Sequence, residues 1–297
     1  MKELNFNKWS DGIAYEIAFW NNVYRWKHTF QGMMNWSNHG GVIRLEKFDA
    51  NAFLTTIPTP LILDVGCGMS YATGNYMERH GQLEKHDIHY VDPLASHFNR
   101  ILHAYHKPLP EIEFGMIEYL SAFYPNHPVD MVIVQNALDH SANPIKGIYE
   151  ALDALRLQGI LYLNHHPNEA VTEHYKGFHQ YNICQENGQL IIWNESERWN
   201  INKILEPIAS VEVCCGDEGH IIAVMRKNAE VPAHLLCDKD DKRALCQQMM
   251  SQMSWQNDIS HSIRHKLKYW KYNTIQFLAQ SLPYDYKMKI KKIIKQA

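Results

Sequence analysis

The stretch from Leu61 to Ser70 constrains the fold of this chain more than any other. Its first apolar residues run directly into the pattern Asp-x-Gly-x-Gly. This pattern predicts a strand that is buried on both faces of a parallel sheet and ends in a tight glycine turn before a helix. Gly66 and Gly68 have no Cβ, so the backbone of the turn can approach a bound ligand closely. We therefore expect an α/β domain with a ligand-binding loop after its first strand.

The residues around this loop narrow the class of ligand. A dinucleotide-binding loop has a third glycine, but Tyr71 occupies that position. Asp64 is also unsuited to a pyrophosphate, whereas a carboxylate there suits a ligand with a cationic head, such as S-adenosylmethionine. With Asp64, Gly66 and Gly68 in this arrangement, the chain resembles the class I S-adenosylmethionine-dependent methyltransferases, and among them the bacterial small-molecule and cell-surface glycan enzymes. An ordinary strand-turn-helix with two convenient glycines is the alternative.

The resemblance implies a fold and a cofactor. We expect a doubly wound, mostly parallel, seven-stranded sheet of the class I methyltransferase type, with S-adenosylmethionine as cofactor. Strand and helix signals alternate along the core of the chain, as such a sheet requires. The chain would divide into an N-terminal helical cap (1–56), a cofactor-binding core (57–228) with a β-hairpin insert at about 174–194, and a C-terminal helical basic extension (229–297).

Further cofactor-binding residues follow the next strands. Asp92 ends the second predicted strand, one helix and one strand beyond Gly68, where its carboxylate can accept hydrogen bonds from ribose hydroxyls. The third segment resembles the part of the family that binds adenine, but Met116 stands where an acid is often found. Met116 or Ile117 would line the adenine pocket, with Glu118 supplying a carboxylate nearby. Asn136, just after the fourth predicted strand, completes the expected cofactor site.

Histidines at the same edge of the sheet are candidates for catalysis. Methyl transfer to an alcohol requires removal of its proton, and a histidine with a near-neutral pKa fits that need. His140, after the fourth strand, is the first choice as general base; His165, after the fifth, is the second, and Asp139 stands beside them in the predicted site. These three residues could alternatively hold a divalent cation, although the mechanism expected here uses no metal.

Composition and charge limit the remaining functions. The chain has 297 residues, 45% of them apolar, no apolar run that could cross a bilayer and no apolar N-terminal signal, so we expect a cytoplasmic protein. The six cysteines show no metal-binding spacing and are expected to be reduced thiols. From residue 262 onward the chain has nine Lys or Arg and only one acid. This tail therefore has a charge of about +8, which leaves about −11 for the rest of the chain.

The sequence thus predicts an S-adenosylmethionine-dependent methyltransferase that O-methylates a sugar or glycan in cell-surface polysaccharide biosynthesis. The alternatives are methylation of another small metabolite and a non-catalytic scaffold that keeps the fold. No nucleic-acid recognition module is present, so nucleic acid is not an expected partner. The sequence leaves open a homo-oligomer and peripheral contact of the basic C-terminal helices with the inner membrane.

Overall fold

The computed structural model describes residues 6–37, 43–73, 87–124, 129–175, 177–236, 244, 263–282 and 286. Three segments that the sequence pattern predicts to be helical lie wholly or mostly outside these residues: the helix after the glycine loop (about 71–80), a helix suggested by Leu245, Met249 and Met253, and the basic segment 287–295. The structure describes residues 71–73 at the start of the first of these, and they form a turn. Among the described helices, none combines the length and apolar character that a membrane span requires.

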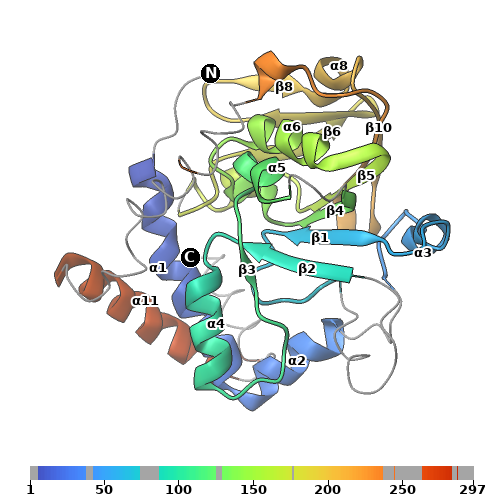
Figure 1. Ribbon diagram of the computed structural model, residues 1–297. Helices are drawn as coiled ribbons and strands as arrows, with labels where there is room; N and C mark the ends of the chain where they lie inside the picture. Colours follow the sequence, from blue (N-terminus) through green and yellow to red (C-terminus); the bar gives the residue numbers. More distant parts are fainter. Residues whose placement is uncertain are drawn as a thin grey trace.

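A seven-stranded sheet forms the centre of the molecule (Figure 1). Its strand order is β3-β2-β1-β4-β5-β10-β9; only β10 runs antiparallel to its neighbours, β5 and β9. The strands are β1 (Leu61–Val65), β2 (Asp87–Asp92), β3 (Glu113–Phe114), β4 (Val129–Gln135), β5 (Leu155–His165), β9 (Ala209–Cys215) and β10 (Ile221–Lys227). This is the mostly parallel, class I methyltransferase fold that the sequence predicts, and the prediction is confirmed.

The sheet separates two hydrophobic cores. Successive residues of β1 point to opposite faces, so Ile62 packs in one core and Leu63 in the other. Residues of α1 and α4 pack in the first core, and residues of α6 and α8 in the second (Figure 1). The helices are α1 (Phe6–Arg25), α2 (Lys27–Ser37), α3 (Ala50–Leu54), α4 (Ala95–Ala104), α5 (Leu120–Phe123), α6 (Pro144–Ala154), α7 (Glu169–Thr172), α8 (Ile201–Leu205) and α11 (Ile263–Ser281). Helices on both faces make the sheet doubly wound.

The expected insert after β5 is a hairpin with one more strand. β6 (Asn182–Glu186) and β7 (Gln189–Trp193) pair across the turn at Asn187 and Gly188, as the sequence predicts. A third strand, β8 (Arg198–Asn200), pairs with β7. The sequence pattern predicts a short helix from Trp199 to Leu205, and this helix starts two residues later, as α8. Ile183, Leu190 and Ile192 of the hairpin are buried in the second core.

The boundary between α6 and β5 differs from the prediction. The sequence favours a helix that continues to Leu157 with a cap at Gln158 and Gly159, but α6 ends at Ala154. Leu155 already pairs with Val129 of β4, and the register then shifts before Met131. Because Leu155 pairs with β4, residues 155–157 belong to strand β5 and not to helix α6.

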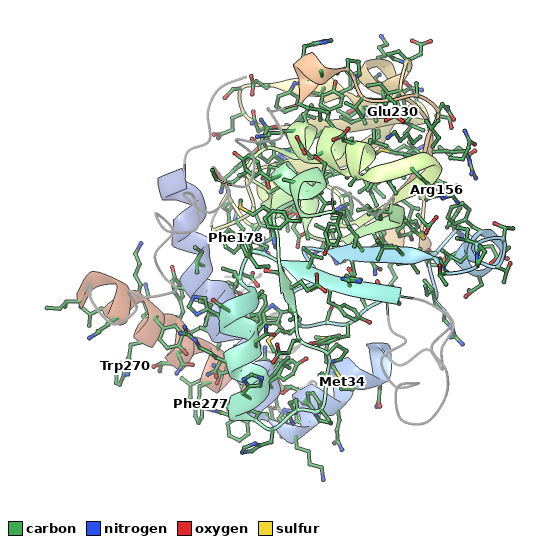
Figure 2. The ribbon with its side chains drawn as sticks, viewed as in Figure 1. Met34, Arg156, Phe178, Glu230, Trp270 and Phe277 are labelled. Atoms are coloured by element: carbon green, nitrogen blue, oxygen red, sulfur yellow. The ribbon has the colours of Figure 1, made fainter. Side chains whose placement is uncertain are left out.

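The helix α11 lies along α1 (Figure 1). Asn22 donates a hydrogen bond to Asn273 at 2.9 Å, and the rings of Tyr15 and Tyr272 meet edge to face at 5.7 Å. Figure 2 shows Trp270 on the outer side of α11, away from the sheet, and this side chain is 73% exposed.

Candidate active site

A cavity of about 470 Å³ lies at the carboxyl ends of the parallel strands. Parallel α/β sheets bind their ligands at this edge, and the volume is within the range of about 300–1,000 Å³ that small-molecule sites occupy. Its walls come from α1, the glycine loop, the end of β2, residues 116–118, the segments after β4 and β5, and the loop at residues 178–179. The cavity thus gathers the sequence segments that were expected to form the site.

The glycine loop forms one wall of the cavity. Gly66 and Gly68 have φ angles of +67° and +54°, which favour glycine. A Cβ on Gly66 would lie 2.6 Å from the Cβ of Ala137, and one on Gly68 would lie 2.8 Å from the ring of Trp20. Both glycines also line the cavity, so their backbone is available to a ligand on that side.

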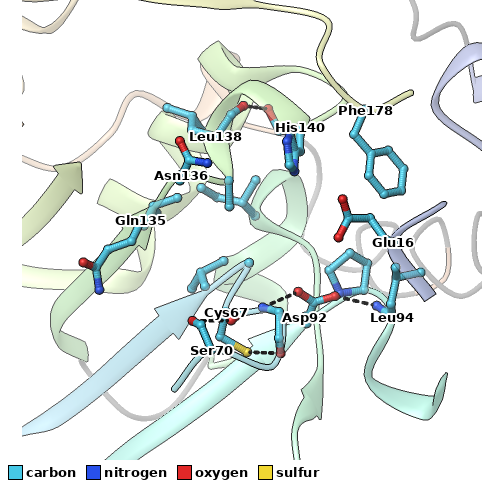
Figure 3. A pocket seen from close by; sticks show the side chains of 18 of the residues that line it. Glu16, Cys67, Ser70, Asp92, Leu94, Gln135, Asn136, Leu138, His140 and Phe178 are labelled. Atoms are coloured by element: carbon cyan, nitrogen blue, oxygen red, sulfur yellow. Dashed lines mark hydrogen bonds between the residues drawn. The ribbon is translucent and has the colours of Figure 1, made fainter. Parts of the chain in front are cut away.

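Asp92 lies at the end of β2 with its carboxylate on the cavity (Figure 3). Its Oδ2 accepts a hydrogen bond from the backbone N–H of Gly68 at 3.0 Å, and its Oδ1 accepts one from Leu94 at 2.8 Å. Each carboxylate oxygen has a second lone pair, so both can still accept a ligand hydroxyl. Burial raises the pKa of Asp92 to about 6, against the opposite effect of the two backbone hydrogen bonds.

Asp64 does not line the cavity. This residue is 2% exposed, and its Oδ2 accepts a hydrogen bond of 2.6 Å from the hydroxyl of Thr73. Burial raises its pKa to about 6. The carboxylate therefore anchors the turn after β1, and its contact with the cationic head of a cofactor stays a prediction.

The expected adenine segment lines the cavity. Met116, Ile117 and Glu118 all contribute to its walls, and Ile117 begins a short 3-10 helix, η2 (Ile117–Tyr119). The Oε1 of Glu118 accepts hydrogen bonds from the backbone N–H groups of Ala142 at 2.6 Å and Asn143 at 3.1 Å. Burial raises the pKa of Glu118, and these hydrogen bonds oppose the rise.

Asn136 also lines the cavity, directly after β4. Its φ of +50° turns the chain, and its backbone N–H donates to the carbonyl of Asn164 at 2.7 Å. The side-chain Oδ1 accepts the backbone N–H of His166 at 3.2 Å. Asn136 thus joins the segment after β4 to the end of β5, and any contact with a cofactor stays a prediction.

The candidate catalytic residues form one cluster, together with a histidine that the sequence did not single out. Nδ1 of His179 lies 2.9 Å from Oδ2 of Asp139 and 3.1 Å from Nε2 of His140. The latter nitrogen is 3.5 Å from the same carboxylate oxygen. His140 and His179 line the cavity, and Figure 3 shows the side chain of His140 pointing into it.

His165 lies behind this cluster. Its side chain is 1% exposed and does not line the cavity, and Nδ1 is 3.9 Å from Oδ1 of Asp139. Neither ring nitrogen makes a hydrogen bond with the described residues. Burial lowers its pKa to about 4, so His165 is neutral at physiological pH.

The charges in the cluster depend on one another. Burial lowers the pKa of His140, so its imidazole is neutral near pH 7, as a proton acceptor must be. Burial also lowers the pKa of His179, but the hydrogen bond and the charge of Asp139 outweigh it and raise the pKa overall. Burial alone would raise the pKa of Asp139, whereas the surrounding histidines, His140 first, lower it overall.

Several residues of the cavity wall were not predicted from the sequence to belong to the site: Glu16, Trp20, Asn164, Glu169, Phe178, His179 and His220. Glu16 could have been identified from the local sequence. An acid among Ile13, Ile17 and Trp20, on the face of α1 that packs in the core, is unusual enough to indicate a function. Burial, followed by the charge of Asp92, raises the pKa of Glu16 to about 7. His179 could not have been identified in this way. It lies in a loop 40 residues from Asp139, and only the tertiary fold brings the two side chains together.

The walls of the cavity fit a cationic, adenosine-bearing cofactor. Among the described residues that line it, none is Lys or Arg, and the charged side chains other than histidine are the acids Glu16, Asp92, Glu118 and Glu169. Such walls would repel a phosphate and attract a sulfonium or ammonium group. The apolar side chains of Met116, Ile117 and Leu138 offer a surface to a flat base.

Comparison with known proteins identifies fold relatives only. No protein-family model and no curated protein matches this chain. Similar solved structures include a 16S rRNA methyltransferase from T. Thermophilus in complex with AdoMet and guanosine, with 14% identity and a TM-score of 0.35; the alignment covers 63% of this chain and 40% of that one. A second is a SAM-bound amino pentose methyltransferase from Micromonospora echinaspora, with 12% identity, coverage of 60% and 88%, and a TM-score of 0.38.

A third similar structure is a SAM dependent methyltransferase from Aquifex aeolicus, with 15% identity, coverage of 67% and 98%, and a TM-score of 0.39. The chain spans 40% of the rRNA enzyme and 59% of another similar structure, the CurJ carbon methyltransferase. At these identities and TM-scores no residue role is transferred, and the fold assignment depends on the strand order described above.

Proposed function

We propose that this protein is an S-adenosylmethionine-dependent methyltransferase that methylates a hydroxyl of a sugar or another small molecule. One observation carries the proposal: a cavity with acidic walls and no described Lys or Arg lies at the carboxyl edge of the sheet, with Asp92 beside the glycine loop. Acidic walls favour a positively charged cofactor, and Asp92 can accept hydrogen bonds from ribose.

The cofactor would lie between the glycine loop and the segment 116–118. Asp92 would hold the ribose through both carboxylate oxygens, and Met116 and Ile117 would contact the adenine. When bound, S-adenosylmethionine supplies an activated methyl group on a good leaving group. The protein therefore has to align the acceptor oxygen with that methyl group and to remove one proton.

The proton would be removed at the cluster of Asp139, His140 and His179. In the metal-free mechanism, Nε2 of His140 accepts the hydroxyl proton as the oxygen forms its bond to the methyl carbon. The carboxylate of Asp139, 3.5 Å from that nitrogen, would stabilise the resulting imidazolium. His165 remains the second candidate for the base. Its side chain is buried and does not line the cavity, so an acceptor in the cavity would not contact it in this conformation.

The acidic walls of the cavity also favour one class of methyl acceptor. An acceptor with hydroxyl groups and no negative charge would fit beside Glu16 and Glu169, whereas an anionic group near them would be repelled. We therefore favour a sugar, free or as the terminal unit of a cell-surface glycan. A scaffold without activity would keep the fold but have no need of an open acidic cavity.

Calorimetry with S-adenosylmethionine tests the proposal. Asp92→Ala should weaken cofactor binding by more than tenfold, because about two charge-assisted hydrogen bonds are lost. Glu195→Ala, at an exposed position in the loop between β7 and β8, is the matched control and should bind as the unaltered chain does. The assignment fails if the unaltered chain does not bind the cofactor, or if Asp92→Ala binds it with equal affinity.

A further inference from the structure

Three ligand atoms converge on one point at the edge of the cavity. They are Oδ2 of Asp139, Nε2 of His140 and Nδ1 of His179, and the distances between them are 2.9, 3.1 and 3.5 Å. All three side chains are at least partly buried. They come from two segments of the chain, the short helix η3 (Leu138–His140) after β4 and the loop before β6.

These separations match those of atoms bound to one metal ion. Ligand atoms at about 2.05 Å from a cation lie about 2.9 Å apart at octahedral angles and about 3.4 Å apart at tetrahedral angles. Hydrogen bonds alone explain the three short distances less well. A single hydrogen on Nδ1 of His179 can point along only one of its two short contacts, to Asp139 or to His140.

The carboxylate of Asp139 provides an independent observation. Its side chain is 3% exposed, and the second oxygen, Oδ1, has no hydrogen-bond partner among the described residues. A buried carboxylate oxygen without such a partner costs free energy unless a nearby positive charge compensates for it. A cation held at Oδ2 would supply that charge.

We propose that Asp139, His140 and His179 bind one divalent transition-metal cation. Two imidazole nitrogens and one carboxylate oxygen form a set that favours Zn²⁺, Fe²⁺ or Co²⁺ over Mg²⁺, which prefers oxygen ligands. Because His140 and His179 line the cavity, the remaining coordination positions face the space where an acceptor would lie. With a cation bound, this site would act in place of the metal-free mechanism described above, and it uses His179 where the alternative raised from the sequence had His165.

The role of the cation depends on the proposed function, whereas its binding does not. A cation held by Asp139, His140 and His179 would lower the pKa of a hydroxyl that it contacts, and the hydroxyl proton would pass to bulk solvent. The oxygen then forms its bond to the methyl carbon as the carbon–sulfur bond breaks and sulfur keeps the electron pair. In this arrangement His140 is a ligand and not the base.

Titration of the metal-stripped full chain with Co²⁺ alone tests the site, because the visible absorption of Co²⁺ reports its coordination. We expect one equivalent to bind, with Zn²⁺ displacing it and Mg²⁺ failing to do so. His179→Ala and His140→Ala should each weaken binding at least tenfold. His103→Ala is the control, because His103 is exposed on α4 beside Glu111, and this variant should bind Co²⁺ as the unaltered chain does.

Two outcomes would overturn the site: no Co²⁺ binding by the unaltered chain, or equal binding by His179→Ala, which would place the metal at another of the 18 histidines. Thermal unfolding provides a check on folding. Zn²⁺ should raise the Tm of the unaltered chain and of His103→Ala but not that of a folded His179→Ala. Calorimetry with S-adenosylmethionine on metal-stripped protein separates the two proposals, because cofactor binding without metal binding would contradict only the cation site.

Discussion

His140 and His165 lie on either side of Asp139, but only His140 reaches the cavity. We expect His140→Ala to lower kcat by about 10²-fold while leaving the affinity for S-adenosylmethionine nearly unchanged, whether the residue acts as base or as metal ligand. Steady-state kinetics and calorimetry on the same preparations measure the two effects. An unaltered rate in His140→Ala, together with an inactive His165→Ala, would move the role to the end of β5.

The residues that the sequence predicts well are those whose position depends on the local chain. Asp92 is the last residue of β2 and Gly66 directly follows β1, and the carboxyl ends of parallel strands lie at the ligand-binding edge of the sheet. Asp64 also follows this rule, but its rotamer and its bond to Thr73 depend on packing that the sequence does not encode locally. His179 is 40 residues from Asp139, and only the folded insert brings them together.

At the scale of elements, hydrophobic pattern and turn residues predict the sheet and the hairpin. The strands β1, β4 and β7 coincide closely with apolar runs bounded by turn residues, whereas β6 begins three residues after the start of the run at His179 that predicts it. The end of α6 was not predictable in this way. Leu155 suits a helix or a strand equally, and its pairing with Val129 across the sheet decides between them.

The helix α11 presents an apolar stripe that the described chain leaves uncovered. Tyr272, Asn273 and Gln276 face α1 or are buried, and the ring of Phe277 lies 5.2 Å from that of Trp26. Four other apolar side chains remain 59–76% exposed: Ile263, Leu267, Trp270 and Leu278. Exposed lysines flank this stripe, so we propose that it lies on an anionic membrane surface, where each basic residue contributes about 1 kcal/mol.

Sedimentation with anionic vesicles at low salt tests this proposal. The full chain should pellet with the vesicles, and the paired substitution Leu267→Ala and Trp270→Ala should reduce the pelleted fraction several-fold, as should added salt. Leu157→Ala removes a comparable side chain that is 49% exposed on β5, and it should behave as the unaltered chain does. Equal sedimentation of all three proteins would exclude the membrane, and a concentration-dependent dimer lost in the paired variant would assign the stripe to a second copy.

At the scale of the whole molecule, the uneven charge of the sequence has a counterpart in the structure. The chain has a formal net charge of −3, and its basic C-terminal part is balanced by an acidic body. Within that body, four acids line one cavity, while the described lysines of α11, a helix packed against α1, do not line it. The distribution thus separates a surface that suits anionic lipid from a cavity that suits a cationic cofactor.

If the proposed function holds, this distribution would make binding of S-adenosylmethionine depend on pH. In the free protein, burial raises the pKa of Glu16 to about 7 and that of Asp92 to about 6, so both are partly protonated between pH 5 and 7. The cofactor has a net positive charge and stabilises the ionised carboxylates, which lowers their pKa values in the complex. Binding therefore releases protons in this range, and affinity must rise with pH until both acids are ionised in the free protein.

We expect the affinity for S-adenosylmethionine to increase by up to about tenfold per pH unit for each acid that must ionise, and to level off above about pH 8, where Glu16 is ionised in the free protein. Calorimetry at pH 6 in two buffers of different ionisation enthalpy should show net proton release. Glu16→Gln should reduce that release, because it removes a carboxyl group whose pKa in the free protein is about 7. S-adenosylhomocysteine, which has no sulfonium charge, should show a weaker dependence. A flat affinity between pH 5.5 and 7.5 would mean that the cation does not lie beside these two carboxylates.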